Sequence, residues 1–223
     1  MFVEGPAAAE SEGLFAREWN RQIAGMEAQA SATEIADMRQ KGYQSLDEPA
    51  ESASAAGDSL VAVINHVPRE NDNGLKSILL SIETAKKSID IENGYFILTP
   101  ALLRSLERAR ERGVRIRVLM NSQESLDVPA LLDPMLESAS DARDKGAEIY
   151  LRKGSTLHAK FMVVDDDYAW VGSYNFQPRS ERMEREVLYG VLDPAFAARM
   201  REIFEADINA AHKLEGPIEI PFS

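Results

Sequence analysis

A short stretch of the chain carries side chains that could together bind and transfer a phosphate group. In HAKFMVVDDDYAWVGSYN these are His158, Lys160, Asp165, Gly172, Ser173 and Asn175. An imidazole can attack phosphorus or move a proton, and an ammonium two residues away can hold an anion. A small residue, a hydroxyl and an amide that follow can line the same site. The spacing therefore predicts a site for a phosphate-containing substrate.

The residues between these groups predict the element that positions them. Residues 160–165 are apolar, rich in β-branched side chains and end in three Asp residues, which is typical of a strand that enters a turn. Residues 168–171 form the returning strand of this hairpin. Because side chains alternate along a strand, we expect His158 and Lys160 to share one face. An isolated strand histidine is more often structural, but its five companions favour a catalytic role.

The pattern H-x-K-x4-D-x6-G-S-x-N resembles the HKD signature of the phospholipase D superfamily. PRSERMERE, which follows Asn175, is similar to the segment after this signature in bacterial cardiolipin synthases, with Glu184 where they usually carry Asn. Upstream, AKKSIDIENGYFILTPALLRSLERARERGVRIRVLMNS is also similar to these enzymes, as are NSQESLDVPALLD and KGAEIYLRKGSTLHAK. The resemblance covers residues 59–208 and implies a phospholipase D-like domain.

The resemblance also implies roles for individual residues. His158, Lys160, Asp165 and Glu186 match the catalytic set, and Lys160, Ser173 and Asn175 match the groups that hold substrate phosphate. His158 is expected to be the general acid and then the base. Asp165 is expected to brace the hairpin, since a turn carboxylate commonly bonds nearby backbone N–H groups.

A carboxylate that holds the second imidazole nitrogen of His158 is also expected. Glu186 is the preferred residue, while Glu184, two residues earlier, stays an alternative. Tyr95 and Arg179 are further candidates for lining the cleft, against a core position for Tyr95 and a tethering role for Arg179. We treat the other two histidines, at positions 66 and 212, as incidental.

The N-terminal residues resemble the end of a first phospholipase D-like domain. Residues 1–20, MFVEGPAAAESEGLFAREWN, correspond to its closing helix, residues 21–58 to a partly helical linker, and residues 59–223 to a second domain with the HKD motif. A helix is expected near residues 31–40. No second H-x-K occurs, so we expect the C-terminal half of a two-motif enzyme.

The composition limits the classes of partner. The chain has 223 residues and no Cys, with 25 Lys and Arg against 37 Asp and Glu, which gives a net charge of −12. Such a surface disfavours non-specific nucleic-acid binding. No apolar run is long enough to span a bilayer, and no signal peptide is recognisable. The resemblance implies a peripheral location at the cytoplasmic side of a bacterial inner membrane, with no metal or other cofactor.

Between residues 59 and 209 strands and helices alternate. Strands are predicted at 59–66, 114–120, 148–151 and 186–191, with another after residue 89. Helices are predicted after residue 74, at 99–112, up to residue 146 and after Pro194. This order predicts an α/β fold with a mixed sheet and helices on both faces.

Three functions are compatible with these features. The chain could be the catalytic half of a cardiolipin synthase-like phosphatidyltransferase that acts on a phosphatidylglycerol-like phospholipid, which we favour. It could be a single-motif phosphodiesterase or nuclease that completes its site by homodimerisation, or an inactive fragment. The first and second hypotheses differ in the source of the second histidine, which is a separate HKD half or an identical subunit.

Overall fold

The computed structural model describes residues 2–47, 49 and 57–215. Contacts divide the chain into two units, Met1–Asp58 and Ser59–Ser223. The first unit contains helix α1 (Pro6–Glu27) and helix α2 (Ala32–Gln40). The predicted helix near residues 31–40 is confirmed by α2, where Ser31 and Glu34 form a capping box.

Helix α1 is longer than the sequence pattern suggests. Residues 21–27, which the sequence predicts to belong to the linker, continue the helix without a break. They are mostly good helix formers, and Ile23 among them is buried. The helix thus continues from the segment that resembles the end of a first domain into the segment expected to be a partly helical linker.

The second unit is built on one eight-stranded sheet in the order β1-β7-β6-β5-β2-β3-β4-β8. In that order the strands are Leu60–His66, Glu186–Leu192, Tyr168–Gly172, Lys160–Val164, Ser88–Asn93, Arg115–Met120, Glu148–Leu151 and His212–Lys213. The pairs β2–β3 and β3–β4 are parallel, and the remaining pairs are antiparallel. The predicted mixed sheet is confirmed.

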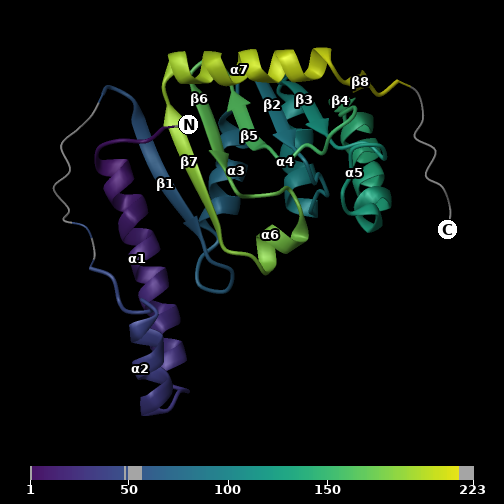
Figure 1. Ribbon diagram of the computed structural model, residues 1–223. Helices are drawn as coiled ribbons and strands as arrows, with labels where there is room; N and C mark the ends of the chain where they lie inside the picture. The colour runs from purple at the N-terminus through teal and green to yellow at the C-terminus, as the bar shows by residue number, and fades with distance from the viewer. Residues whose placement is uncertain (1, 48, 50–56, 216–223) are drawn as a thin grey trace. The chain divides into compact units, whose positions relative to one another are not determined.

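Helices cover both faces of this sheet, as predicted. Helices α3 (Asn73–Thr84), α4 (Pro100–Glu111) and α5 (Leu132–Asp144) lie on one side, and α7 (Pro194–Asn209) lies across the other (Figure 1). A 3-10 turn, η1 (Pro129–Leu131), leads into α5, and a short helix, α6 (Pro178–Arg182), joins β6 to β7. Gly113 and Gly146, at positive φ, follow α4 and α5 and allow the chain to turn into the next strand.

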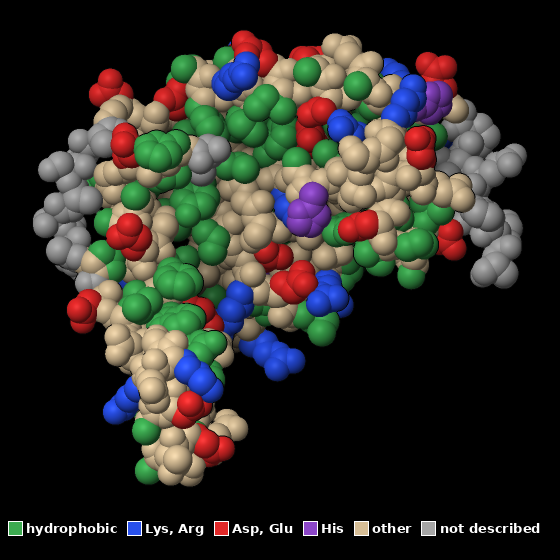
Figure 2. All heavy atoms as spheres, in the orientation of Figure 1, with side chains coloured by type: hydrophobic (Ala, Val, Ile, Leu, Met, Phe, Trp, Pro, Cys, Tyr) green, Lys and Arg blue, Asp and Glu red, His purple; other side chains and the backbone are tan. Residues whose placement is uncertain are grey.

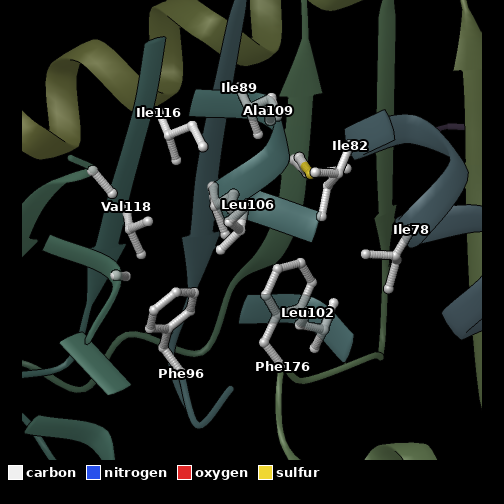
Figure 3. Close-up of a cluster of buried hydrophobic side chains, with 14 of the residues drawn as sticks. Ile78, Ile82, Ile89, Phe96, Leu102, Leu106, Ala109, Ile116, Val118 and Phe176 are labelled. Atoms are coloured by element: carbon white, nitrogen blue, oxygen red, sulfur yellow. The ribbon is translucent and has the colours of Figure 1, made fainter. Parts of the chain in front are cut away.

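The main core lies between the sheet and helices α3, α4 and α5 (Figure 3). Strand β2 is buried on both faces, as expected for a central strand. Ile89 and Ile91 point into this core, and each fully buried Ile side chain contributes about 1.5–3 kcal/mol. Asp90 and Glu92 therefore belong to the opposite face, beneath α7.

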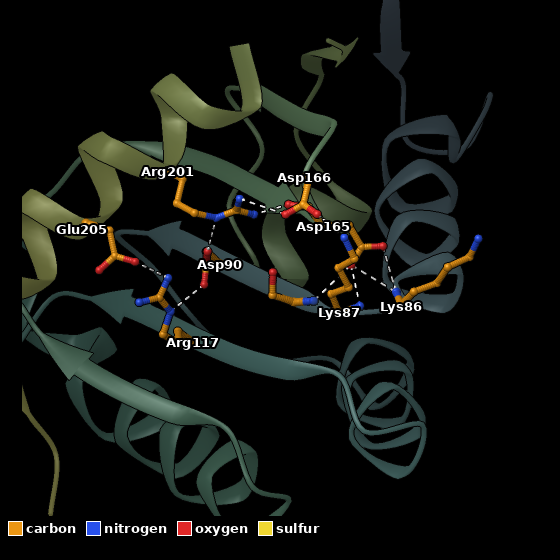
Figure 4. Close-up of polar contacts among 9 residues, drawn as sticks. Lys86, Lys87, Asp90, Arg117, Asp165, Asp166, Arg201 and Glu205 are labelled. Carbon is orange, nitrogen blue, oxygen red and sulfur yellow. Dashed lines mark hydrogen bonds and ion pairs between the residues drawn. The ribbon is translucent and has the colours of Figure 1, made fainter. Parts of the chain in front are cut away.

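Buried charges on that face are paired between the sheet and α7 (Figure 4). Arg117 of β3 donates to Asp90 at 2.7 Å and lies 2.6 Å from Glu205 of α7. Arg201 of α7 donates to the second oxygen of Asp90 at 3.2 Å and to the carbonyl oxygen of Asp165. Burial tends to lower the pKa of Arg117, but its two carboxylate partners outweigh this and raise it. The ion pairs fix α7 and the β5–β6 turn to the centre of the sheet.

Candidate active site

The candidate active site is a pocket of about 540 Å³ where β5 begins, β6 ends and β7 begins. Its lining residues are His158, Lys160, Gly172, Ser173, Asn175, Glu184, Arg185 and Glu186. Strands β6 and β7 approach each other closely beside the pocket. A Cβ on Gly172 of β6 would lie only 2.2 Å from the carbonyl oxygen of Val187 of β7, so only Gly fits there. The fold thus brings together all but Asp165 of the residues that match the catalytic and phosphate-binding sets.

Lys160 is the buried cation of the pocket. Its side chain is mostly buried, and its ammonium donates to the carbonyl oxygen of His158 at 2.8 Å. Burial lowers the pKa of Lys160, while the carboxylates of Glu186 and Asp127 act in the opposite direction. One of the three ammonium hydrogens is used by the His158 carbonyl, so the others can face an anion.

His158 lies in the segment just before β5 and is not itself part of a strand. Its side chain is exposed and still lines the same pocket as Lys160. The imidazole meets the ring of Tyr95 edge-on, with the ring centroids 6.3 Å apart. An exposed imidazole beside a buried cation is suited to proton transfer to or from a bound phosphodiester.

Glu186 is buried, and its carboxylate accepts a hydrogen bond from the Ser173 hydroxyl. In this structure it does not bond the His158 imidazole as predicted, because Ser173 at the end of β6 lies beside it. Burial raises the pKa of Glu186, while the Ser173 hydrogen bond and the His66 imidazole act in the opposite direction.

Ser173 has both of its donors engaged. The hydroxyl donates to Glu186, and the backbone N–H donates to the Val187 carbonyl at 3.0 Å. The hydroxyl oxygen also accepts from Val187 N–H at 3.0 Å. In this state Ser173 has no free hydrogen for a phosphate oxygen, so it holds Glu186 in place.

Asn175 and Arg179 differ in how they relate to the pocket. Asn175 is buried in its lining, and its Oδ1 has no hydrogen-bond partner among the described residues. Its backbone N–H donates to the Ser180 hydroxyl at 3.3 Å. Arg179 is exposed and pairs with Glu184 at 2.6 Å, which fits a tether better than a phosphate contact.

Asp165 lies at the opposite end of β5 from the pocket. Its carboxylate accepts hydrogen bonds from the backbone N–H groups of Lys86, Lys87 and Ser88 at 2.7–3.1 Å. Asp165 comes five positions after Lys160, which is about 16 Å along a strand. The structure therefore places Asp165 where it can brace the start of β2 and not where it can touch a substrate in the pocket.

Two residues beside the site had been given no role from the sequence. His66 is fully buried on β1 opposite Glu186 of β7, and its Nε2 lies 3.1 Å from the carbonyl oxygen of Glu181. Asp127 accepts a hydrogen bond from the Tyr95 hydroxyl at 2.6 Å. The signal for Asp127 was available, because residues that follow adjacent parallel strands converge at one edge of a sheet.

The described residues contain no group of His, Asp and Glu side chains that could hold a metal ion. They also include no helix long and apolar enough to cross a bilayer. On the face shown in Figure 2, acidic and basic side chains are interspersed and do not gather into a broad basic patch.

A family model described as cardiolipin synthase, PLD-like domain, matches residues 78–208, which is more than half of the chain. The chain belongs to this family. The chain is 29% identical over 162 residues to a cardiolipin synthase of Staphylococcus aureus N315, and the match covers 72% of the chain and 32% of the relative. It is 30% identical over 133 residues to cardiolipin synthase 1 of Staphylococcus epidermidis ATCC 12228, covering 60% and 27%. The chain thus spans about a third or less of these relatives.

Solved structures confirm the fold of the PLD-like domain. The phospholipase D family member Nuc of Salmonella typhimurium matches with a TM-score of 0.61 and 19% identity, covering 71% of this chain and 100% of Nuc. The phosphatidylserine synthase of Haemophilus influenzae matches with a TM-score of 0.62 and 17% identity, covering 81% of this chain and 45% of the synthase. At these identities the matches establish the shared fold.

Proposed function

We propose that this chain supplies one catalytic half-site of a phospholipase D-type phosphatidyltransferase. The observation that carries the proposal is a pocket with one exposed imidazole, His158, beside one buried ammonium, Lys160. The substrate class is a phosphatidylglycerol-like phospholipid, in line with the membership of the cardiolipin synthase, PLD-like domain family. We place the working enzyme at the cytoplasmic face of a bacterial inner membrane.

The reaction needs two imidazoles, because one attacks phosphorus while the other protonates the leaving group. A histidine of a second half-site attacks the phosphodiester, and the P–O bond to the leaving alcohol breaks. His158 gives its proton to the departing alkoxide, which leaves a phosphohistidine. An acceptor hydroxyl then gives its proton to His158 and attacks phosphorus, and the N–P bond breaks. Lys160 and the Asn175 amide stabilise the charge on the non-bridging oxygens.

Within the described residues no second imidazole lines the pocket. Of the three histidines in the sequence, His66 is fully buried behind Glu186, and His212 lies on β8, at the far edge of the sheet from β7. The second half-site must therefore come from another polypeptide segment. A separate HKD half and an identical subunit are the two sources to be compared.

The test is transfer of labelled phosphatidylglycerol, followed by chromatography of cardiolipin and glycerol. We expect negligible turnover by the monomer and turnover when the chain is combined with a polypeptide that carries a first HKD half-site. His158→Gln should then lower the rate about 100-fold or more, and His212→Gln, the matched control, should not. Turnover by a demonstrated monomer would refute the half-site argument, and turnover by a homodimer alone would favour the phosphodiesterase alternative.

A further inference from the structure

Tyr95 and Asp127 come from two loops that meet beside the pocket. Tyr95 follows the carboxyl end of β2, and Asp127 lies in the loop after β3. Because β2 and β3 are parallel neighbours, both loops leave the sheet at the same edge. The Tyr95 hydroxyl donates to Asp127 Oδ1 at 2.6 Å and ties the two loops together.

The ring of Tyr95 contacts both members of the catalytic pair. Its edge-on contact with the His158 imidazole has an interplanar angle of 82°, and the Lys160 ammonium lies 6.0 Å from the ring centroid. The imidazole of His158 makes no hydrogen bond to any residue that the structure describes, so the aromatic contact is the observed restraint on its orientation. Edge-to-face ring pairs contribute measurably beyond their buried area.

We propose that Tyr95 and Asp127 are positioning residues, which hold the His158 imidazole and the Lys160 ammonium in register for a phosphate group. This inference rests on the proposed function for the role of the pocket, although the contacts themselves do not. The rigid ring of Tyr95 packs beside the imidazole and the ammonium, and the hydrogen bond to the Asp127 carboxylate keeps the ring in that position.

The electrostatics agree with this arrangement. Burial, and then the hydrogen bond to Asp127, raise the pKa of Tyr95 to about 12, so its hydroxyl stays a donor throughout the neutral range. The charge of Asp127 also favours the protonated form of Lys160. Since a misplacement of about 1 Å can lower a rate about 100-fold, a small rotation of either group would matter.

The experiment uses inorganic phosphate as the probe and the imidazole NMR signals of the full chain as the readout. The sequence has only three histidines, so His158→Gln assigns the signal of interest. Tyr95→Phe and Asp127→Ala each remove the hydrogen bond and should weaken phosphate binding about threefold to tenfold, the range of one net hydrogen bond. Both should also shift or broaden the His158 signal.

Two conservative variants are controls. Asp127→Asn keeps an oxygen that can accept from Tyr95, so phosphate affinity should stay within about twofold of the wild type in mildly acidic buffer, where Lys160 stays protonated without the charge of Asp127. Tyr150→Phe removes a similar bond, from Tyr150 to Glu148 at 3.2 Å, away from the pocket and should change neither readout. In a double-mutant cycle the effects of Tyr95→Phe and Asp127→Ala should be non-additive, since both break one bond.

An unchanged His158 signal in Tyr95→Phe and Asp127→Ala would overturn the proposal. A loss in Asp127→Asn as large as in Asp127→Ala would overturn it too, because charge and not the hydrogen bond would then be responsible. If the wild type binds no phosphate but the His158 signal still responds to these variants, the positioning role stands and the proposed function fails.

Discussion

Substitution of Asp165 separates the structural part of the HKD motif from its catalytic part. Its carboxylate accepts from the backbone N–H groups of Lys86, Lys87 and Ser88, and its own φ is +50°. Lys86 and Lys87 are exposed, so water can replace the carboxylate there, but Ser88 is buried. Asp165→Ala therefore leaves one buried donor, the backbone N–H of Ser88, without a partner.

The expected loss of stability follows from these contacts. An orphaned buried N–H costs about 1–3 kcal/mol, and Ala in the left-handed region costs about 1–2 kcal/mol more. The free energy of unfolding should fall by about 3 kcal/mol, and the Tm of a domain of this size by about 6–12 °C. Asp165→Asn keeps one acceptor oxygen and tolerates positive φ, so its loss should be about 1 kcal/mol.

Asp166→Ala is the matched control, because Asp166 is exposed and its ion pairs with Lys87 and Arg201 are screened by solvent, so its loss should change the free energy of unfolding little. The assay is thermal and urea unfolding of the three variants, followed by turnover of the complete enzyme below each Tm. Folded Asp165→Ala should retain near-wild-type turnover, because the residue lies at the other end of β5 from the pocket. An unchanged Tm with lost turnover, or equal losses for Asp165→Ala and Asp166→Ala, would refute this reasoning.

Three other perturbations have defined outcomes. Lys160→Met should lower the turnover of the complete enzyme about 100-fold through lost charge stabilisation, and phosphate affinity of the unmodified chain should fall as pH rises through the lowered pKa of Lys160. Asp90→Asn should lower the free energy of unfolding by about 3–5 kcal/mol in urea titrations, because it leaves the buried Arg117 short of a charged partner. Burial raises the pKa of Glu92 to about 8, so its contribution to stability is complete below pH 4.5 and declines towards pH 8, by up to about 1.4 kcal/mol per pH unit. Glu92→Gln should flatten that slope in unfolding curves measured across this range, and an unchanged slope would contradict the assignment.

Local sequence patterns were enough to predict the hairpin, most elements of the α/β unit and the pocket residues of the hairpin, whereas Glu184 and Glu186 came from the family resemblance and Arg185 was not predicted. The alternation of side chains along the sequence predicts strands β5 and β6. The ends of α4 and α5 are predicted by the glycines that follow them, because Gly readily adopts the positive φ found there. The spacing of His158 and Lys160 likewise predicts a shared pocket, and both residues line it even though His158 precedes the strand.

Tertiary structure decided which partner each polar group has. Ser173 bonds Glu186, Tyr95 bonds Asp127, and Asp165 bonds the backbone at the start of β2. The residues in each pair are separated along the sequence, and the order of strands in the sheet brings them together. The sequence alone determined the types of group that the site contains. A hydrogen bond depends on distance and direction within a few tenths of an ångström, so only the packed sheet and loops could determine how those groups are paired.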